Sequence, residues 1–327
     1  MLPPRSAWPG WPGCAASADP PALRFALIYN PVSGHGAGRI AADQAGAHLE
    51  ASGHEVARFE TRHEEGARET ARRAAAEGVD RVLAIGGDGT VVEAAEGILE
   101  ARRADSSVVA ALAVVPRGTA NVLALNLAIP TATMDALATA VDGRATPIDV
   151  GLLEGVPFLL AVSTGFHAEM VARASRTAKR RLGVVAYALA GWRASREAVR
   201  TDYRLTMDGV TEELEGTMIQ VMNCGAVFRR SWEFAPGISP VDGRLDVLVY
   251  RARTLAEYLA TAALVVRGTP LDTALVERRS AARLVIEAVP PTRLQRDGEM
   301  AGQTPARVEV LPRALPVVLP PGSPWAA

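Results

Sequence analysis

Apolar and polar residues follow two different patterns along the chain, and the first covers residues 23 to about 143. There, short apolar runs of the kind found in buried strands are each followed by a stretch of helical periodicity. Strand and helix alternate four times, which predicts a parallel, doubly wound sheet with helices on both faces. We therefore expect an N-terminal Rossmann-like α/β domain. The expected strands are residues 23–29, 54–61, 81–87 and 108–116.

After Gly143 the pattern changes to short alternating segments joined by turn dipeptides. Glu154-Gly155 and Asp208-Gly209 predict two hairpins, and further strands are expected over 243–252, 282–288 and 306–312. Helical segments are expected near 168–199 and 255–267. We predict a second, C-terminal domain of mostly antiparallel β structure, with the active site in the cleft between the two domains.

These patterns divide the chain into four segments. Residues 1–22, rich in Pro, Gly and Trp, are predicted to form a disordered tail. The two domains are expected over 23–145 and 146–312, with a C-terminal segment over 313–327.

Composition narrows the classes of function. The 327 residues carry a net charge of −1, so no overall charge attracts the chain to nucleic acid. The only two cysteines are Cys14 and Cys224, which favours a reduced, cytoplasmic setting over a secreted one. No uninterrupted apolar stretch approaches the ~20 residues that a membrane-spanning helix needs.

Glycine-bearing loops follow three of the expected strands, at 30–38, 86–90 and 116–119. Glycine lets a ligand reach backbone N–H groups, and a helix N-terminus favours an anion, so the middle loop indicates a phosphate site. A tight turn without a ligand is the alternative. Asp88 favours the ligand, because an acid beside phosphates must bind a metal ion, pair with a cation or accept a proton.

Four short motifs in order, at 30–34, 86–90, 116–121 and 297–299, resemble the diacylglycerol kinase catalytic family. The resemblance covers residues 24–312 and implies a nucleotide-binding α/β domain followed by a β-sandwich domain. The family resemblance, and not the pattern, suggests that the C-terminal segment 313–327 packs back on the first domain. It also implies that ATP lies over the three loops. The residues it places at the nucleotide are Asn30, Pro31, Ser33, Gly34, Thr61, Gly86, Gly87, Asp88, Gly89, Thr90, Glu93, Gly118, Thr119 and Asn121.

The same resemblance assigns the chemistry. Mg²⁺ is expected on the ATP phosphates, with Asp88 as a catalytic acid of the loop, and Asp297 and Glu299 are candidates for the base that activates an alcohol. From spacing alone, 297–299 is equally a hairpin turn. The loop before residue 245 resembles a structural Mg²⁺ site, with Asp242 and the carbonyl oxygens of Ser239 and Arg244 as ligands; a turn before a strand is the alternative.

Three positions differ from the family pattern. Val122 follows Asn121 where many members have aspartate, and His35 stands where relatives often carry lysine. His167 replaces an acid that holds an amino-alcohol headgroup in sphingosine kinases, which weakens a sphingosine reading. Arg173, Arg176, Lys179, Arg180 and Arg181 form a basic cluster that would suit an anionic membrane surface, or else a solvated helix face.

The leading hypothesis is an ATP-dependent lipid kinase that phosphorylates a hydroxyl of diacylglycerol or a related glycerolipid. Its lipid would be met at a membrane surface, so the enzyme would be cytoplasmic or peripheral on the inner membrane face. A homodimer is left open, and no nucleic-acid partner is expected. The alternatives are an enzyme related to NAD kinase or phosphofructokinase, whose loops also use GGDG, and a nucleotide- or lipid-binding protein without catalysis.

Overall fold

The computed structural model describes residues 22–31, 37–61, 66–165, 168, 201–227, 229–233, 235–252, 254–267 and 273–326. Several predictions fall elsewhere in the chain: the tail over 1–21, Ser33, Gly34, His35, His167, the basic cluster and nearly all of the helix expected near 168–199.

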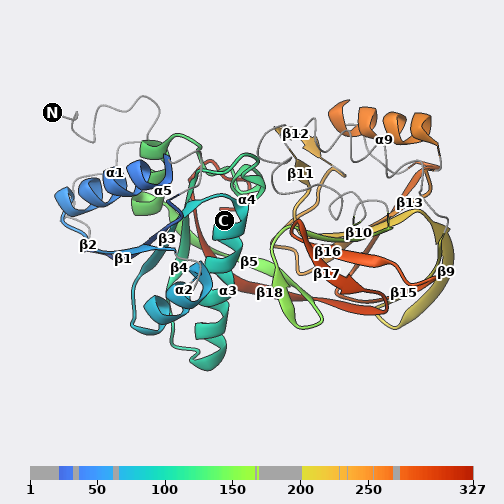
Figure 1. The fold of residues 1–327 in the computed structure, drawn as a ribbon, viewed down its shortest axis with the longest axis horizontal. Helices are drawn as coiled ribbons and strands as arrows, with labels where there is room; N and C mark the ends of the chain where they lie inside the picture. The colour runs from blue at the N-terminus through green and yellow to red at the C-terminus, as the bar shows by residue number, and fades with distance from the viewer. Residues whose placement is uncertain are drawn as a thin grey trace.

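The N-terminal part, from β1 to α5, confirms the predicted doubly wound α/β arrangement (Figure 1). Its strands pair in parallel in the order β2-β1-β3-β4. Helices α1 and α5 pack on one face and α2 and α3 on the other. The bounds are β1 Arg24–Tyr29, α1 Ala37–Ala51, β2 Glu55–Glu60, α2 Ala67–Ala76, β3 Arg81–Gly86, α3 Asp88–Ala104, β4 Ala111–Pro116, α4 Val122–Asn126 and α5 Thr133–Asp142.

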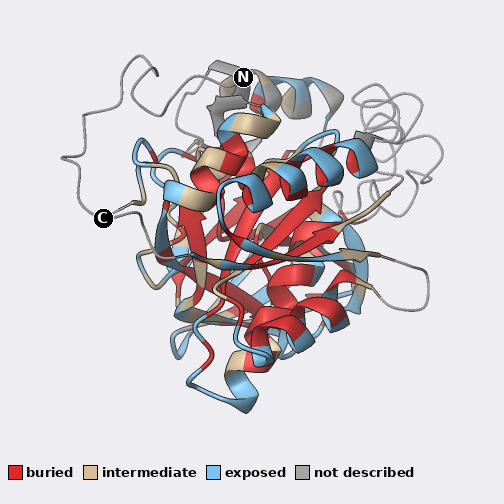
Figure 2. Cartoon of the chain, turned by 90° about the vertical axis from the view of Figure 1, so that its left-hand side faces the viewer, coloured by how far each residue is buried: buried red, intermediate tan, exposed pale blue. Residues whose placement is uncertain are grey.

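Burial on both faces explains why the central strands are apolar throughout. Every residue of β4 is buried, as are five of the six in β3, and Figure 2 shows such strands in red between helices with exposed outer surfaces. The helix expected to open near Ala120 is two helices, α4 and α5. Pro130 separates them, because proline lacks an N–H and disfavours helix at the residue before it.

A long antiparallel ribbon connects the two parts. Its strands are β5 (Arg144–Leu153) and β18 (Ala306–Leu319). Because β18 also pairs with β15 near its N-terminal end and with β4 near its C-terminal end, ten of the described strands form one continuous sheet. Residue 145, where the sequence suggests a boundary, is the second residue of β5, so the parts share a sheet.

The C-terminal part is the expected antiparallel β-sandwich. Strands β8, β9 and β15 of the shared sheet face a second sheet ordered β14-β13-β10-β7-β16-β17, with a common apolar core between them. Helix α9 lies over the outer side (Figure 1). The bounds are β6 Val156–Phe158, β7 Ala161–Thr164, β8 Thr201–Met207, β9 Val210–Gly216, β10 Met218–Met222, β11 Ala226–Val227, β12 Arg229–Glu233, β13 Leu245–Tyr250, α9 Leu255–Arg267, β14 Val276–Ala281, β15 Arg283–Val289, β16 Arg293–Arg296 and β17 Glu299–Gln303.

Candidate active site

The three glycine-bearing loops lie at one edge of the parallel sheet, because they follow the adjacent strands β1, β3 and β4. Backbone hydrogen bonds tie them together. The N–H of Asn30 donates to the carbonyl at the end of β3 (3.3 Å), and the N–H of Arg117 donates to the carbonyl of Gly86 (2.7 Å). Pro31 and Thr61 lie at the same edge, after β1 and β2.

Gly87 and Gly118 bring two of these loops into direct backbone contact. A Cβ atom on Gly118 would lie 2.5 Å from the Cα of Gly87, and one on Gly87 would lie 3.1 Å from the Cα of Gly118. Gly86 is covered by the buried side chain of Thr90, 2.7 Å from where its Cβ would be. Packing inside the protein therefore accounts for these three glycines without a ligand.

Gly89 is different, because a Cβ atom there would have no neighbour within 4 Å. It lies in the first turn of α3, a helix of 17 residues with Gly87 as N-cap and no side-chain cap hydrogen bond. The N-terminus of a helix has N–H groups without intrahelical partners and a positive partial charge. Open space over glycine at an uncapped helix N-terminus fits the phosphates of a nucleotide.

The carboxylate of Asp88 turns towards the third loop. Its Oδ1 accepts the N–H of Leu123 in α4 at 3.2 Å. Burial raises the pKa of Asp88, and backbone donors at the start of α4 oppose that rise. The acid between the glycines therefore links the β3–α3 loop to α4, a role that its place in the sequence did not indicate.

Two more of the predicted nucleotide residues have clear contacts within the protein. Asn121, in the left-handed region at φ 48°, accepts the N–H of Gly118 (2.7 Å) and donates to its carbonyl (3.0 Å). Glu93 accepts the N–H of Ala67 (3.0 Å) at the start of α2. Thr119 is exposed. The side chain of Asn121 thus holds the loop after β4 in place, and that of Glu93 holds the start of α2.

The motif at 297–299 forms a tight turn between β16 and β17. Arg296 pairs with Glu299 across the hairpin, and the two residues between them have positive φ, 46° at Asp297 and 87° at Gly298. Two left-handed residues in succession define a type I′ turn, which Asp-Gly favours. The hairpin reading of these residues is therefore correct, and a catalytic role remains compatible with it.

The structure separates the two acids that the sequence left together. Asp297 accepts three backbone N–H groups, from Leu159 (2.8 Å), Leu160 (3.0 Å) and Ala161 (3.0 Å). Burial raises its pKa to about 6, although these donors lower it. Glu299 is exposed. Asp297 thus anchors the turn to the β6–β7 link, which leaves Glu299 as the acid accessible to a substrate.

A buried thiol brings the two motifs together. Cys224 is fully buried, and burial raises its pKa together with the negative charges of Asp297 and Asp88. Cys224 packs in one apolar cluster with Val91 of α3 and Leu123 of α4. Its N–H donates to the carbonyl of Leu160 (3.2 Å), whose own N–H donates to Asp297, so segments 209 positions apart in the sequence meet at this side chain. The β3–α3 loop and the 297–299 turn converge on a single region, between the N-terminal and C-terminal parts.

The predicted structural metal site is a closed turn. Asp242 Oδ1 accepts the N–H of Arg244 at 3.0 Å, and Ser239 Oγ accepts the N–H of Val241 at 3.3 Å. The buried carboxylate of Asp149 accepts the N–H of Gly243 at 2.6 Å. These contacts hold the loop without an ion, so the assignment of Mg²⁺ to it stays a prediction.

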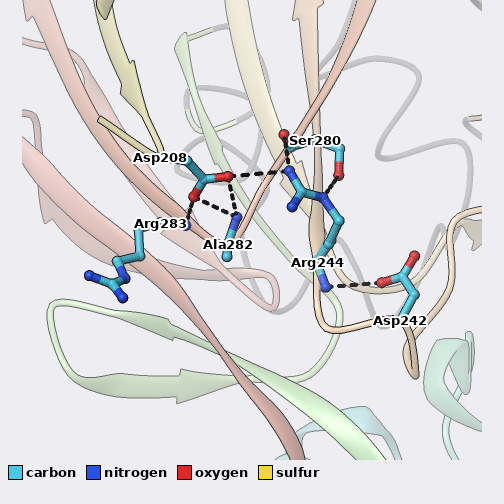
Figure 3. Close-up of polar contacts among 6 residues, drawn as sticks. All are labelled: Asp208, Asp242, Arg244, Ser280, Ala282 and Arg283. Carbon is cyan, nitrogen blue, oxygen red and sulfur yellow. Dashed lines mark hydrogen bonds and ion pairs between the residues drawn. The ribbon is translucent and has the colours of Figure 1, made fainter. Parts of the chain in front are cut away.

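Figure 3 shows how Arg244 fixes the far side of this turn. Its guanidinium donates to Ser280 Oγ (2.8 Å) and to Asp208 (3.2 Å). Asp208 also accepts the N–H groups of Ala282 and Arg283 (3.0 and 2.9 Å). The side chain of Arg244 therefore joins two hairpins of the sandwich and is engaged within the protein.

Two general features concern metals and membranes. No cluster of three or more His, Cys, Asp or Glu side chains that could hold a metal ion occurs among the described residues. No described helix is both long enough and apolar enough to cross a bilayer.

Sequence reasoning missed the residues that join the two parts. Asn126 and Cys224 carry no motif, and Glu96 and Arg296 form an ion pair (3.4 Å) between α3 and β16. Glu96 lies eight residues after Asp88, on a helix whose periodicity marks it only as one of several charged positions. No signal in a single sequence identifies such contacts, because their partners lie far away in the chain.

Comparison with known proteins agrees with this geometry. A model of the diacylglycerol kinase catalytic domain matches residues 24–153, and one described as YegS C-terminal NAD kinase beta sandwich-like domain matches residues 160–319. The chain is 31% identical to the uncharacterized protein sll0036 of Synechocystis sp. over 310 residues, 90% of this chain and 70% of the relative. It is 28% identical to diacylglycerol kinase of Bacillus subtilis over 300 residues, 91% of this chain and 96% of the relative.

Solved structures share the fold. One from Bacillus anthracis str. Sterne superposes with a TM-score of 0.78 at 23% identity and covers 96% of this chain and 100% of its own. A diacylglycerol kinase from the same strain gives 0.72 at 20% identity, with coverage of 92% and 98%. These structures share the fold of the chain, an α/β part followed by a β-sandwich part. The chain belongs to the diacylglycerol kinase catalytic family.

Proposed function

We propose that this chain is an ATP-dependent lipid kinase that transfers the γ-phosphate of ATP to the hydroxyl of diacylglycerol or a related glycerolipid. The observation that carries the proposal is the convergence of two features. The uncapped N-terminus of α3 with open space over Gly89 suits phosphates, and the turn bearing the exposed Glu299 is joined to the same helix by the ion pair of Arg296 with Glu96 (3.4 Å). Family membership supports phosphoryl transfer as the reaction.

The roles of the residues follow from their surroundings. The first-turn N–H groups of α3 bind and orient the phosphates, which is most of what phosphoryl transfer requires of a protein. Glu299 accepts the proton of the lipid hydroxyl. Asp297 stays bound to the 159–161 backbone and fixes the direction in which the turn presents Glu299. ATP supplies the phosphoryl group, and Mg²⁺ is expected to enter with it.

Diacylglycerol is the preferred acceptor because a relative of this chain, the matched Bacillus subtilis protein, is called a diacylglycerol kinase. The substrate would be met at the cytoplasmic face of a membrane, where ATP is available. NAD is the rival acceptor, since the second matched domain is described as NAD kinase beta sandwich-like.

The test supplies Mg²⁺-ATP labelled at the γ-phosphate together with diacylglycerol in mixed micelles, sphingosine, NAD or fructose 6-phosphate. We expect label in the glycerolipid. Glu299→Gln should lower kcat by about 100-fold or more, the usual contribution of a general base. Glu309→Gln, a change at another exposed glutamate, on β18, is the matched control and should leave kcat unchanged. Label in NAD or the sugar but in no lipid would refute the proposal.

A further inference from the structure

A single asparagine joins the nucleotide-loop side of the molecule to strand β11 of the C-terminal part by paired hydrogen bonds. Asn126, the last residue of α4, donates from Nδ2 to the carbonyl of Ala226 (3.0 Å) and accepts the N–H of Ala226 at Oδ1 (2.8 Å). The side-chain amide thus pairs with the backbone of β11 as a neighbouring strand would. A side-chain amide carries a donor and an acceptor next to each other, as this pairing with one backbone residue requires.

Further contacts hold Asn126 in place. Its Nδ2 also donates to the carbonyl of Val122 (2.8 Å), which fixes the rotamer against α4. Its own carbonyl accepts the indole N–H of Trp325 (2.9 Å). The other end of α4 donates the N–H of Leu123 to Asp88. One short helix therefore contacts the start of α3 at one end and strand β11 at the other, as its position in Figure 1 illustrates.

From Ala226 the hydrogen bonds continue to the turn that carries Glu299. Two residues before Ala226, the N–H of Cys224 donates to the carbonyl of Leu160 (3.2 Å). The N–H of Leu160 donates to Asp297 at 3.0 Å. A connected path thus runs from Asp88 through α4, Asn126, β11 and the β6–β7 link to Asp297.

We propose that Asn126 is a positioning residue that sets the distance between the phosphate site at the N-terminus of α3 and the acid Glu299. The expected effect of Asn126 on kcat rests on the proposed function, whereas its expected effect on the hydrogen bonds between α4 and Asp297 does not. Asn126 lies outside both reacting groups, so its removal leaves each of them intact and loosens their spacing. In-line transfer is sensitive to such spacing, since a displacement of about 1 Å can cost about 100-fold in rate.

The kinetic test is Asn126→Ala, with Trp325→Phe as the matched control, which removes a hydrogen bond to the same residue but leaves both bonds to Ala226. Asn126→Ala should lower kcat about tenfold or more, while its affinity for ADP stays within about twofold of the wild type, because neither the N-terminus of α3 nor its bond to Leu123 involves the side chain of Asn126. Trp325→Phe should change neither. Unchanged kcat in folded Asn126→Ala, or an equal loss of kcat and ADP affinity, would overturn the positioning role.

A second measurement separates this inference from the proposed function. Hydrogen exchange of the Cys224 and Leu159–Ala161 amides should speed up in Asn126→Ala and stay unchanged in Trp325→Phe, whether or not any lipid is phosphorylated. Faster exchange confined to α4 and Ala226 would show that Asn126 acts only locally, and it would refute the proposal that Asn126 positions the turn that carries Glu299. If Asn126→Ala does not fold, Asn126→Asp, which keeps the acceptor for Ala226 N–H, undergoes the same two measurements with the same criteria.

Discussion

Replacing Gly89 by alanine should stabilise the protein and weaken nucleotide binding at the same time. The added methyl group has no protein atom within 4 Å, so no clash opposes it. Alanine in place of glycine within a helix contributes about 0.5–1 kcal/mol, and the first turn of α3 falls at the lower end of that range. For a chain of 327 residues that corresponds to an increase in Tm of about 1 °C.

The same methyl group occupies the space into which we place the phosphates. Because the anion must approach the N–H groups of the first turn to hydrogen-bond distance, a Cβ there should weaken ATP and ADP binding about tenfold or more, the loss of one to two charge-assisted hydrogen bonds. Calorimetry gives the affinities, and thermal unfolding followed by circular dichroism gives Tm.

Gly118→Ala is the contrasting variant, because its Cβ would lie 2.5 Å from the backbone of Gly87. It should lower both Tm and nucleotide affinity. The reasoning fails if Gly89→Ala binds ATP as the wild type does, since the open space at α3 would then not be the phosphate site. It also fails if Gly89→Ala unfolds at a lower temperature, since the space would then not be open.

Two further predictions concern the half-buried acids Asp297 and Asp88. The pKa of Asp297 is about 6 in the folded protein against an ordinary 3.8. Its contribution to stability is therefore fully present below pH 4 and is lost as the pH rises through 6. At roughly 1.4 kcal/mol per pKa unit, the loss in unfolding free energy is about 3 kcal/mol. Urea unfolding of Asp297→Asn should lack that slope between pH 4 and 7, and an unaltered slope would assign it to another group. Asp88→Asn keeps an oxygen for the N–H of Leu123, so its unfolding free energy at pH 7 should lie within about 1 kcal/mol of the wild type, while kcat falls about 100-fold through loss of the charge; near-normal turnover would deny Asp88 a catalytic role.

Much of the fold could be predicted from residue pattern, because local chemistry determines it. Buried parallel strands are apolar throughout, so the alternation of 24–29, 55–60, 81–86 and 111–116 with helices predicts the doubly wound sheet. Glu154-Gly155, Asp208-Gly209 and Asp297-Gly298 predict their turns, since all six residues adopt positive φ. Short motifs in order were enough to identify the family.

The site was predictable as a set of loops but not as a set of contacts. The glycines at 87 and 118 proved to touch each other, Asp88 proved to contact α4, and Glu93 to contact the start of α2. Each of these partners lies between 26 and 35 positions away along the chain. Spacing reveals which residues share an element, but it carries no information about which element lies opposite.

The sequence by itself determined the elements, their order, the turn residues and the family, because each depends on interactions within a few positions of the chain. Tertiary structure alone decided which acid remains accessible. Asp297 and Glu299 are two positions apart and chemically alike, yet only Asp297 meets the 159–161 backbone, more than 130 positions away. Tertiary structure also decided how the two parts are joined, by a shared strand pair and by Asn126. Those choices depend on packing between distant segments, where desolvation and hydrogen-bond partners are set by the assembled fold.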